Sequence, residues 1–103
     1  MPSVLQVEWS DQGTTRVVVA TGELDVASAQ RLRKEVDRAI ADRPETVVLD
    51  LTGLAFCDSS GVRLTRSAQR HAAAQGVRFV ALRPREPICR VFEICDAAST
   101  AVA

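Results

Sequence analysis

The chain has 103 residues, of which 47% are hydrophobic and 25% are charged. This length and composition fit one folded domain and exclude a disordered chain, because a domain of this size buries roughly 65% of its unfolded-chain surface without disulfides or metals. Thirteen basic side chains balance thirteen acidic ones, so no net charge attracts the chain to nucleic acid or to an anionic membrane, and neither is expected as a partner.

The first predicted elements are two strands, residues 4–9 and 16–20, joined as a hairpin through the turn-forming residues 10–13. After Asp25, apolar residues recur at helical spacing and predict an amphipathic helix. Its predicted apolar face consists of Val26, Ala29, Leu32, Val36, Ala39 and Ile40. Pro44 marks the end of that helix.

A second series of elements follows. The continuous apolar run 46–51 predicts a central strand covered on both faces, and residues 59–75 predict a second helix. Residues 77–82 predict a fourth strand, and Pro87 opens a third helix. The apolar positions of these two helices are Leu64, Ala68 and Ala72 in the first, and Ile88, Val91, Phe92 and Cys95 in the second.

The element order is therefore ββαβαβα. Strands separated by helices imply parallel pairs, and the opening hairpin adds an antiparallel pair. We predict a single α/β domain over residues 1–103, with a mixed sheet of about four strands packed by amphipathic helices and a core over about 4–95. The short tail, 96–103, is interpreted either as a frayed end or as an edge left for a partner.

The targeting pattern and the cysteine spacing each carry one expectation. The N-terminus lacks a signal-peptide pattern, and no segment approaches the ~18 consecutive apolar residues of a membrane span. We expect a cytoplasmic protein with no membrane partner. Cys57, Cys89 and Cys95 lack Cys-x-x-Cys spacing, so they predict neither a disulfide framework nor a metal site, and we interpret them as buried thiols.

The junction between the central strand and the second helix is the candidate functional segment. It reads Asp58-Ser59-Ser60-Gly61. The start of a helix presents free backbone N–H groups and favours anions, so these two hydroxyls lie where a phosphate could be carried or bound. Gly61 would allow close approach by another molecule. The alternative is that Asp58 or Ser59 simply caps the helix.

A serine hydrolase is a second interpretation of these hydroxyls. However, the segment lacks the Gly-x-Ser-x-Gly elbow, and the single histidine, His71, falls about three helical turns beyond Ser60. We therefore expect no catalytic residue and no enzyme activity.

Residues 48–62 resemble the signature of STAS-domain anti-sigma factor antagonists. The family's Asp-Ser-Ser-Gly matches residues 58–61 without substitution, and its Gly-Glu-Leu-Asp matches residues 22–25. The predicted element order also agrees with this family across roughly residues 4–95.

The resemblance implies a phosphorylation switch. The second serine of the motif, Ser60, would offer an exposed hydroxyl to an anti-sigma factor that is itself a serine kinase, and Ser59 would be its unmodified neighbour. The unphosphorylated form would bind this kinase and release the sigma factor, and phosphorylation would prevent binding. A PP2C-type phosphatase would reset the switch. ATP and Mg²⁺ would belong to the kinase, so no cofactor is expected here.

The resemblance also implies supporting residues around the acceptor. Asp58 and Gly61 would flank it, and Asp25 would lie near it in space, with a simple helix cap as the alternative for Asp25. Glu23, Val62 and Arg63 would belong to the partner-binding surface, together with Ser59.

Several features depart from the family pattern. Arg63, Arg66 and Arg70 form one stripe on the second helix, interpreted either as a solvated face or as a contact for an acidic partner. Arg63 stands where the family often has a small or apolar residue, so it could tune partner choice. Cys57 replaces a larger hydrophobe, and a redox-sensitive thiol is the alternative to a buried one.

A rival from another class is a STAS scaffold or sensor subunit. Such a protein would bind a protein partner constitutively, or carry a small ligand, without being a kinase substrate. Phosphate transfer from ATP by a cognate kinase distinguishes the two.

Overall fold

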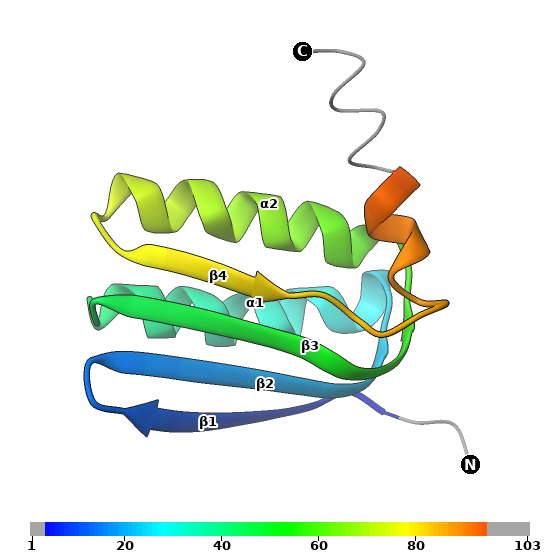
Figure 1. Ribbon diagram of the computed structural model, residues 1–103, viewed down its shortest axis with the longest axis horizontal. Helices are drawn as coiled ribbons and strands as arrows, with labels where there is room; N and C mark the ends of the chain where they lie inside the picture. Colours follow the sequence, from blue (N-terminus) through cyan, green and yellow to red (C-terminus); the bar gives the residue numbers. More distant parts are fainter. Residues whose placement is uncertain (1–3, 95–103) are drawn as a thin grey trace.

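The computed structural model describes residues 4–94 and packs a four-stranded sheet against two long helices (Figure 1). The strands are β1 (Gln6–Gln12), β2 (Thr15–Leu24), β3 (Thr46–Cys57) and β4 (Arg78–Leu82), and the helices are α1 (Val26–Ala41) and α2 (Ser59–Ala74). A short third helix includes residues 90–94. The predicted order ββαβαβα is confirmed.

The sheet is mixed, as predicted, with the spatial order β1-β2-β3-β4. β1 and β2 pair antiparallel, whereas β2–β3 and β3–β4 pair parallel. The hairpin turn occupies residues 13–14 and not 10–13, so β1 is longer than expected. Each parallel pair is connected through a helix. After one strand ends, the chain must return to the opposite edge of the sheet before the next strand can run in the same direction, and the helix makes this return.

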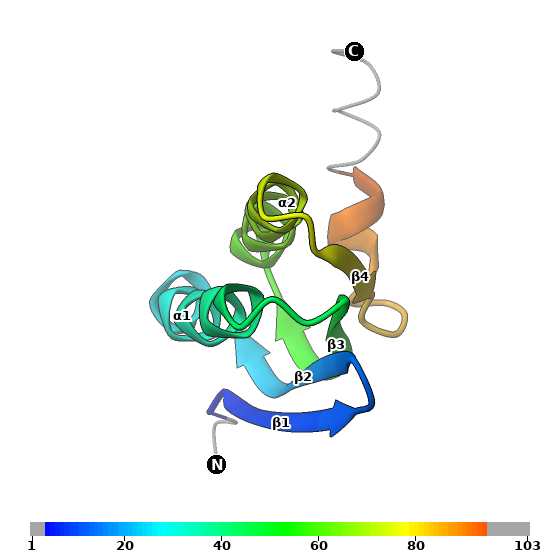
Figure 2. The same ribbon diagram turned by 90° about the vertical axis from the view of Figure 1, so that its left-hand side faces the viewer.

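Both helices lie on one face of the sheet (Figure 2). The expectation that residues 46–51 are covered on both faces is therefore wrong. Val47, Leu49 and Leu51 are fully buried toward the helices, whereas Val48 is half-buried on the other face. In register, Val48 lies between a valine of β2 and a valine of β4, so lateral neighbours in the sheet cover part of it.

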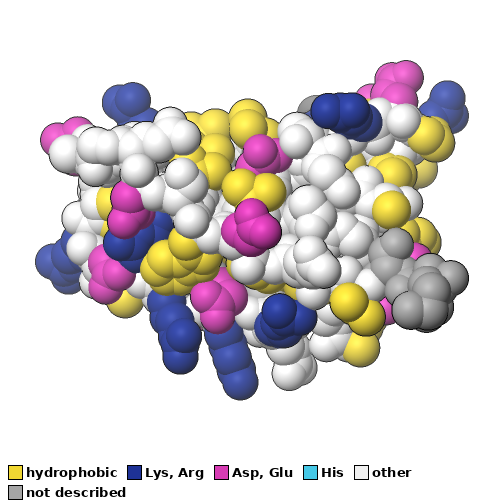
Figure 3. Space-filling view, turned by 90° about the horizontal axis from the view of Figure 1, so that it is seen from below, with side chains coloured by type: hydrophobic (Ala, Val, Ile, Leu, Met, Phe, Trp, Pro, Cys, Tyr) yellow, Lys and Arg dark blue, Asp and Glu magenta, His cyan; other side chains and the backbone are white. Residues whose placement is uncertain are grey.

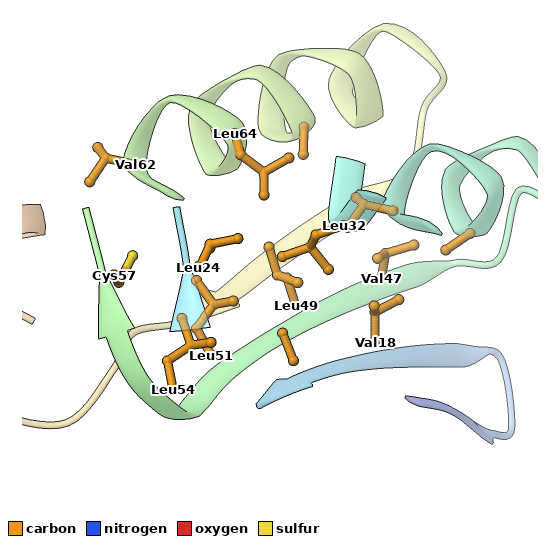
Figure 4. Close-up of a cluster of buried hydrophobic side chains, with 14 of the residues drawn as sticks. Val18, Leu24, Leu32, Val47, Leu49, Leu51, Leu54, Cys57, Val62 and Leu64 are labelled. Carbon is orange, nitrogen blue, oxygen red and sulfur yellow. The ribbon is translucent and has the colours of Figure 1, made fainter. Parts of the chain in front are cut away.

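The core lies between the sheet and the two helices (Figure 4). The predicted apolar faces of both helices are largely confirmed. The buried helical side chains include Leu32, Val36, Ala39 and Ile40 from α1, and Leu64, Ala68 and Ala72 from α2. Val26, the first residue of α1, is instead 67% exposed, so the apolar face of this helix begins one turn later.

The third helix begins later than predicted. Residues 86–89 form a turn, in which the Arg90 N–H donates to the Pro87 carbonyl at 3.1 Å, and helical structure starts at residue 90. Ile88 and Val91 pack against the core and Phe92 is buried, so their predicted spacing is confirmed. Cys95 and the tail 96–103 lie outside the described residues. No helix within residues 4–94 is both long and apolar enough to cross a membrane.

Candidate functional site

The two motifs meet at one edge of the sheet. β2 and β3 run parallel, so the helix that follows each strand begins at the same edge, on the right of Figure 1. The Asp58 N–H donates to the Leu24 carbonyl at 3.2 Å, which joins the residue before α2 to the residue before the α1 cap. The structure therefore brings Asp25 and Asp58, which are thirty-three residues apart in the sequence, to adjacent helix starts.

 The two capping positions are thus neighbours in space although separate motifs carry them.

The start of α1 is closed by a reciprocal cap. The Asp25 carboxylate accepts a hydrogen bond from the Ser28 backbone N–H at 2.9 Å, and the Ser28 hydroxyl accepts one from the Asp25 N–H at 3.0 Å. The backbone N–H of Ser28, and then its hydroxyl, hold the pKa of Asp25 below its ordinary value. Asp25 therefore caps α1 and also lies beside the start of α2.

The residues before Asp25 shape the same edge. Gly22 has a φ of +95°, and a Cβ there would lie 2.1 Å from the Val4 carbonyl oxygen, so only glycine fits. The Glu23 carbonyl accepts a hydrogen bond from the Ser28 hydroxyl at 3.1 Å. The Glu23 side chain, with Asp25 and others, lines a shallow hollow at this edge.

The start of α2 has a helix cap but lacks the reciprocal hydrogen bond found at α1. The Asp58 carboxylate accepts a hydrogen bond from the Ser60 N–H at 2.8 Å, so Asp58 is the helix cap that the alternative interpretation expected. Ser59, the first residue of α2, is exposed. Its hydroxyl oxygen accepts a hydrogen bond from Nη1 of Arg63 at 3.3 Å, four residues further along the helix.

Ser60 is buried, so the expectation that it offers an exposed hydroxyl is wrong. Its side chain is 6% exposed, and its Oγ has no hydrogen-bond partner among the described residues. The cause is the helical repeat: Ser60 lies four residues before Leu64 and eight before Ala68, on the stripe of α2 that faces the sheet. Ser59 points outward because successive side chains are ~100° apart around a helix.

Gly61 and Val62 are also buried, and this corrects two further expectations. A Cβ on Gly61 would lie 2.4 Å from the Cys57 Sγ and 2.9 Å from a Leu24 methyl carbon. The close approach that Gly61 allows is therefore made by this chain itself and not by another molecule. Val62 is 2% exposed and packs in the core, so its side chain offers almost no surface to a partner.

Cys57 packs as a buried thiol at the end of the core, as Figure 4 shows. Burial, and secondarily the charge of Asp58, raise its pKa to about 11, so the thiol stays protonated at neutral pH. This state disfavours the redox-sensitive alternative, because the thiolate is the reactive form. Cys89 is free and only half-buried.

Exposed apolar side chains flank the two helix starts, and sequence reasoning missed them. Phe56 is 47% exposed and pairs with Glu23 in the sheet register, Val26 directly follows Asp25, and Val4 lies against Gly22. Apolar groups gathered beside polar ones are typical of protein-binding surfaces. The exposure of Phe56 could have been predicted from the alternation of side chains along a strand. Cys57 faces the core, so the side chain of the neighbouring Phe56 points to the opposite face of the sheet.

His71 lies far from the serines. It follows Ser60 by eleven residues, about 16 Å along the helix axis. Its Nδ1 contacts the Asp37 carboxylate of α1 at 3.1 Å. The described residues therefore do not assemble a serine–histidine pair, and the hydrolase interpretation loses its structural basis.

A family model for the STAS domain matches residues 6–100. The chain belongs to the STAS domain family. An anti-sigma F factor antagonist of Lysinibacillus sphaericus is 34% identical over 80 residues, which cover 77% of this chain and 68% of that relative. The anti-sigma-F factor antagonist RsfB of Mycobacterium tuberculosis is 28% identical over 78 residues, which cover 76% of this chain and 63% of RsfB. The resemblance predicted from the two motifs is confirmed.

Solved structures of the anti-sigma factor antagonist SpoIIAA share the architecture of this STAS domain. The match to unphosphorylated SpoIIAA has a TM-score of 0.72 at 29% sequence identity, and it covers 90% of this chain and 81% of the SpoIIAA chain. The match to the phosphorylated form of SpoIIAA from Bacillus has a TM-score of 0.67 at 28% sequence identity, and it covers 93% of this chain and 86% of that SpoIIAA chain. The fold is thus shared with a protein that exists in both states.

Proposed function

We propose that this STAS domain is an anti-sigma factor antagonist, and that it binds its anti-sigma factor through the edge where α1 and α2 begin. The antagonist relatives support the class of partner. The exposed apolar side chains beside the two helix starts support the location, because an interface needs apolar contact area as well as polar groups. Like its relatives, the chain would act as a regulator and not as an enzyme.

We further propose that phosphorylation of Ser59 switches this binding off. The observation that carries the proposal is the contrast between the two serines: Ser59 is exposed, whereas the Ser60 hydroxyl is buried. A kinase must bring the γ-phosphate of ATP within bonding distance of the acceptor oxygen, which a solvent-exposed hydroxyl permits. Ser59 therefore replaces Ser60 as the proposed acceptor.

The transfer would need little chemistry from this chain. The Ser59 Oγ forms a bond to the γ-phosphorus of ATP while the bond from that phosphorus to the bridging oxygen breaks, and ADP leaves. The serine proton passes to a base on the kinase, which also supplies the ATP and Mg²⁺. A PP2C-type phosphatase would reverse the step by hydrolysis and restore the Ser59 hydroxyl.

The phosphate would act by charge. It adds about −1.5 to −2 charges at the first residue of α2, where the helix dipole favours an anion and Arg63 already contacts the serine oxygen. The fold tolerates this charge, but an apolar partner surface packed on the same edge does not. Each ~1.4 kcal/mol of lost binding free energy weakens affinity tenfold, so one phosphate can release the partner without unfolding the domain.

Intact-mass spectrometry tests the acceptor. After incubation with ATP and the cognate anti-sigma factor kinase, we expect the wild type and Ser60→Ala to gain one phosphate and Ser59→Ala to gain none. A phosphate that disappears in Ser60→Ala but persists in Ser59→Ala would return the assignment to Ser60. No mass gain in the wild type, with the kinase still bound, would favour the constitutive scaffold.

Binding of the same kinase tests the switch. We expect Ser59→Glu and phosphorylated wild type to bind the anti-sigma factor at least tenfold more weakly than unmodified wild type, with an unchanged far-UV circular dichroism spectrum. Ser59→Gln, which adds similar volume without charge, is the matched control. Equal weakening by Ser59→Gln would show that volume, and not charge, blocks the interface.

A further inference from the structure

The outer groove between α1 and α2 is lined by arginines. Its residues, which we call the basic groove, are Arg33 of α1 and Arg63, Leu64, Arg66, Ser67 and Arg70 of α2. They enclose a shallow hollow of about 410 Å³. The arginine stripe of α2 therefore lines the same hollow as a fourth arginine, Arg33 of α1. A solvated face of one helix would not include an arginine from a second helix.

Positive charge is concentrated on this layer of the fold. α1 and α2 together carry seven basic and two acidic residues, and α2 itself contains no acidic residue, although the whole chain has no net charge. In contrast, the face seen from the β1 side shows acidic and basic side chains interspersed (Figure 3). The basic groove is thus a local excess of charge that its own helices do not balance.

The acidic groups of α1 are already engaged. Asp37 accepts hydrogen bonds from Arg33 at 3.1 and 3.2 Å and also contacts His71, and Glu35 pairs with Arg38 at 3.8 Å. Among residues 4–94, Arg63 and Arg70 form no ion pair, and both are exposed. Guanidinium groups in this situation are suited to bind carboxylates, because their planar N–H forks match a carboxylate in two parallel hydrogen bonds.

We propose that the basic groove binds an acidic segment of the protein partner and forms a second contact surface beside the helix starts. This inference rests on the proposed function for the identity of the partner. The arginines from Arg63 to Arg70 span about 10 Å of helix, a length that suits a few acidic side chains. Within residues 4–94, no aromatic side chain lines the basic groove, so this part of the chain offers no stacking platform of the kind typical of single-stranded nucleic acid sites.

Arg63 connects the basic groove to the proposed switch. It lines the groove and donates a hydrogen bond to the Ser59 hydroxyl. A phosphate on Ser59 would pair with Arg63 and add negative charge at the end of the groove. Phosphorylation would therefore weaken the acidic contact along α2 as well as the contact at the sheet edge.

An NMR titration tests the acidic ligand class without any anti-sigma factor. We expect a decaglutamate peptide, added to the full chain at low salt, to shift amide resonances of the basic groove, and Arg70→Glu to weaken the binding at least fivefold. Arg78→Glu, an exposed arginine at the start of β4, is the matched control and should change affinity less than twofold. Shifts centred elsewhere, or equal losses in both variants, would contradict the proposal. Tighter, groove-centred binding of a ten-nucleotide single-stranded RNA would assign the groove to nucleic acid instead.

A second measurement separates this inference from the proposed function. With the cognate kinase, Arg70→Glu should still accept phosphate on Ser59 but bind the kinase at least fivefold more weakly than Arg78→Glu. Normal phosphorylation with unchanged binding of Arg70→Glu would contradict the groove and leave the proposed function intact. If the wild type neither bound nor accepted phosphate from the kinase while the peptide still bound the groove, the proposed function would be wrong and the acidic-ligand site would remain.

Discussion

The two helix starts lie at the same edge of the sheet and use the same capping residue, but they are completed differently. At α1, the third helical residue is Ser28, whose hydroxyl oxygen accepts a hydrogen bond from the Asp25 backbone N–H. At α2, the third helical residue is Gly61, which has no side chain and packs against Cys57. At the start of α1 the polar groups of Asp25 and Ser28 bind each other, whereas at the start of α2 the Ser59 side chain stays exposed.

This difference separates the residues that hold the fold from the one residue proposed to accept a phosphate. The α1 cap uses its polar groups to hold the helix. At α2, Asp58, Ser60 and Gly61 fix the helix against the core, and Ser59 is the residue that faces solvent. The following predictions test this division.

The largest expected effect separates the two serines. Ser60→Asp should lower the free energy of unfolding by about 3–5 kcal/mol, because it buries a charge without a partner. Ser59→Asp should change it by less than about 0.5 kcal/mol, since an exposed acid at a helix start is well tolerated. Urea denaturation followed by circular dichroism measures both.

Ser60→Ala is the control for that experiment. Because the Ser60 hydroxyl has no partner among the described residues, its removal should leave stability unchanged or slightly higher. A loss above about 1 kcal/mol in Ser60→Ala, or similar losses in the two aspartate variants, would contradict the assigned burial.

The packing of Gly61 should give the next largest effect. Gly61→Ala should destabilise the domain by about 1–3 kcal/mol, because the added methyl overlaps the Cys57 sulfur. In Gly61→Ala/Cys57→Ala the sulfur is absent, so part of this loss should be recovered, and a double-mutant cycle on unfolding free energies measures the coupling. Additive losses would show that the two residues do not touch.

The reciprocal cap of α1 should have a smaller effect. Ser28→Ala removes the hydrogen bond to the Asp25 N–H and should cost about 0.5–1 kcal/mol of unfolding free energy. Ser67→Ala, in the middle of α2, is the matched control and should cost less than about 0.5 kcal/mol. If both variants were equally stable, the cap would not contribute.

The pH dependence of Asp25 is the smallest predicted effect. Its folded-state pKa lies below its ordinary value of 3.8, so its stabilising contribution is complete above that value and is lost as the pH falls through the folded pKa. Asp25→Asn should therefore flatten the pH dependence of unfolding free energy below about pH 4, where the lowered pKa of Asp25 makes its contribution pH-dependent. Part of the dependence should persist, because a hydrogen bond from Arg16 likewise lowers the pKa of Asp11.

The sequence predicts the element order and most of the core because both follow from short repeats along the chain. Leu32, Val36 and Ile40 recur with the period of a helix, and burial follows that period. The coverage of the sheet was mispredicted, because the apolar run around Val48 looks the same whether helices or lateral neighbours cover it.

The exposure of Ser60 was mispredicted although the sequence contains the signal. The motif match alone does not distinguish two adjacent serines. The helical repeat does, since Ser60 shares its stripe with Leu64 and Ala68, and Ser59 shares its stripe with Arg63. The basic groove, in contrast, needs the packing of α1 beside α2, because Arg33 is thirty residues away from Arg63 in the chain.

The burial of Ser60 and Gly61 has a consequence for how such motifs are interpreted in other chains. Three of the four residues 58–61 serve the fold, so a chain with alanine at position 59 would keep the pattern Asp-x-Ser-Gly and fold normally. It would nevertheless have no hydroxyl to modify. Under the function proposed above, the single position 59 then distinguishes a domain that can be switched from one that binds permanently.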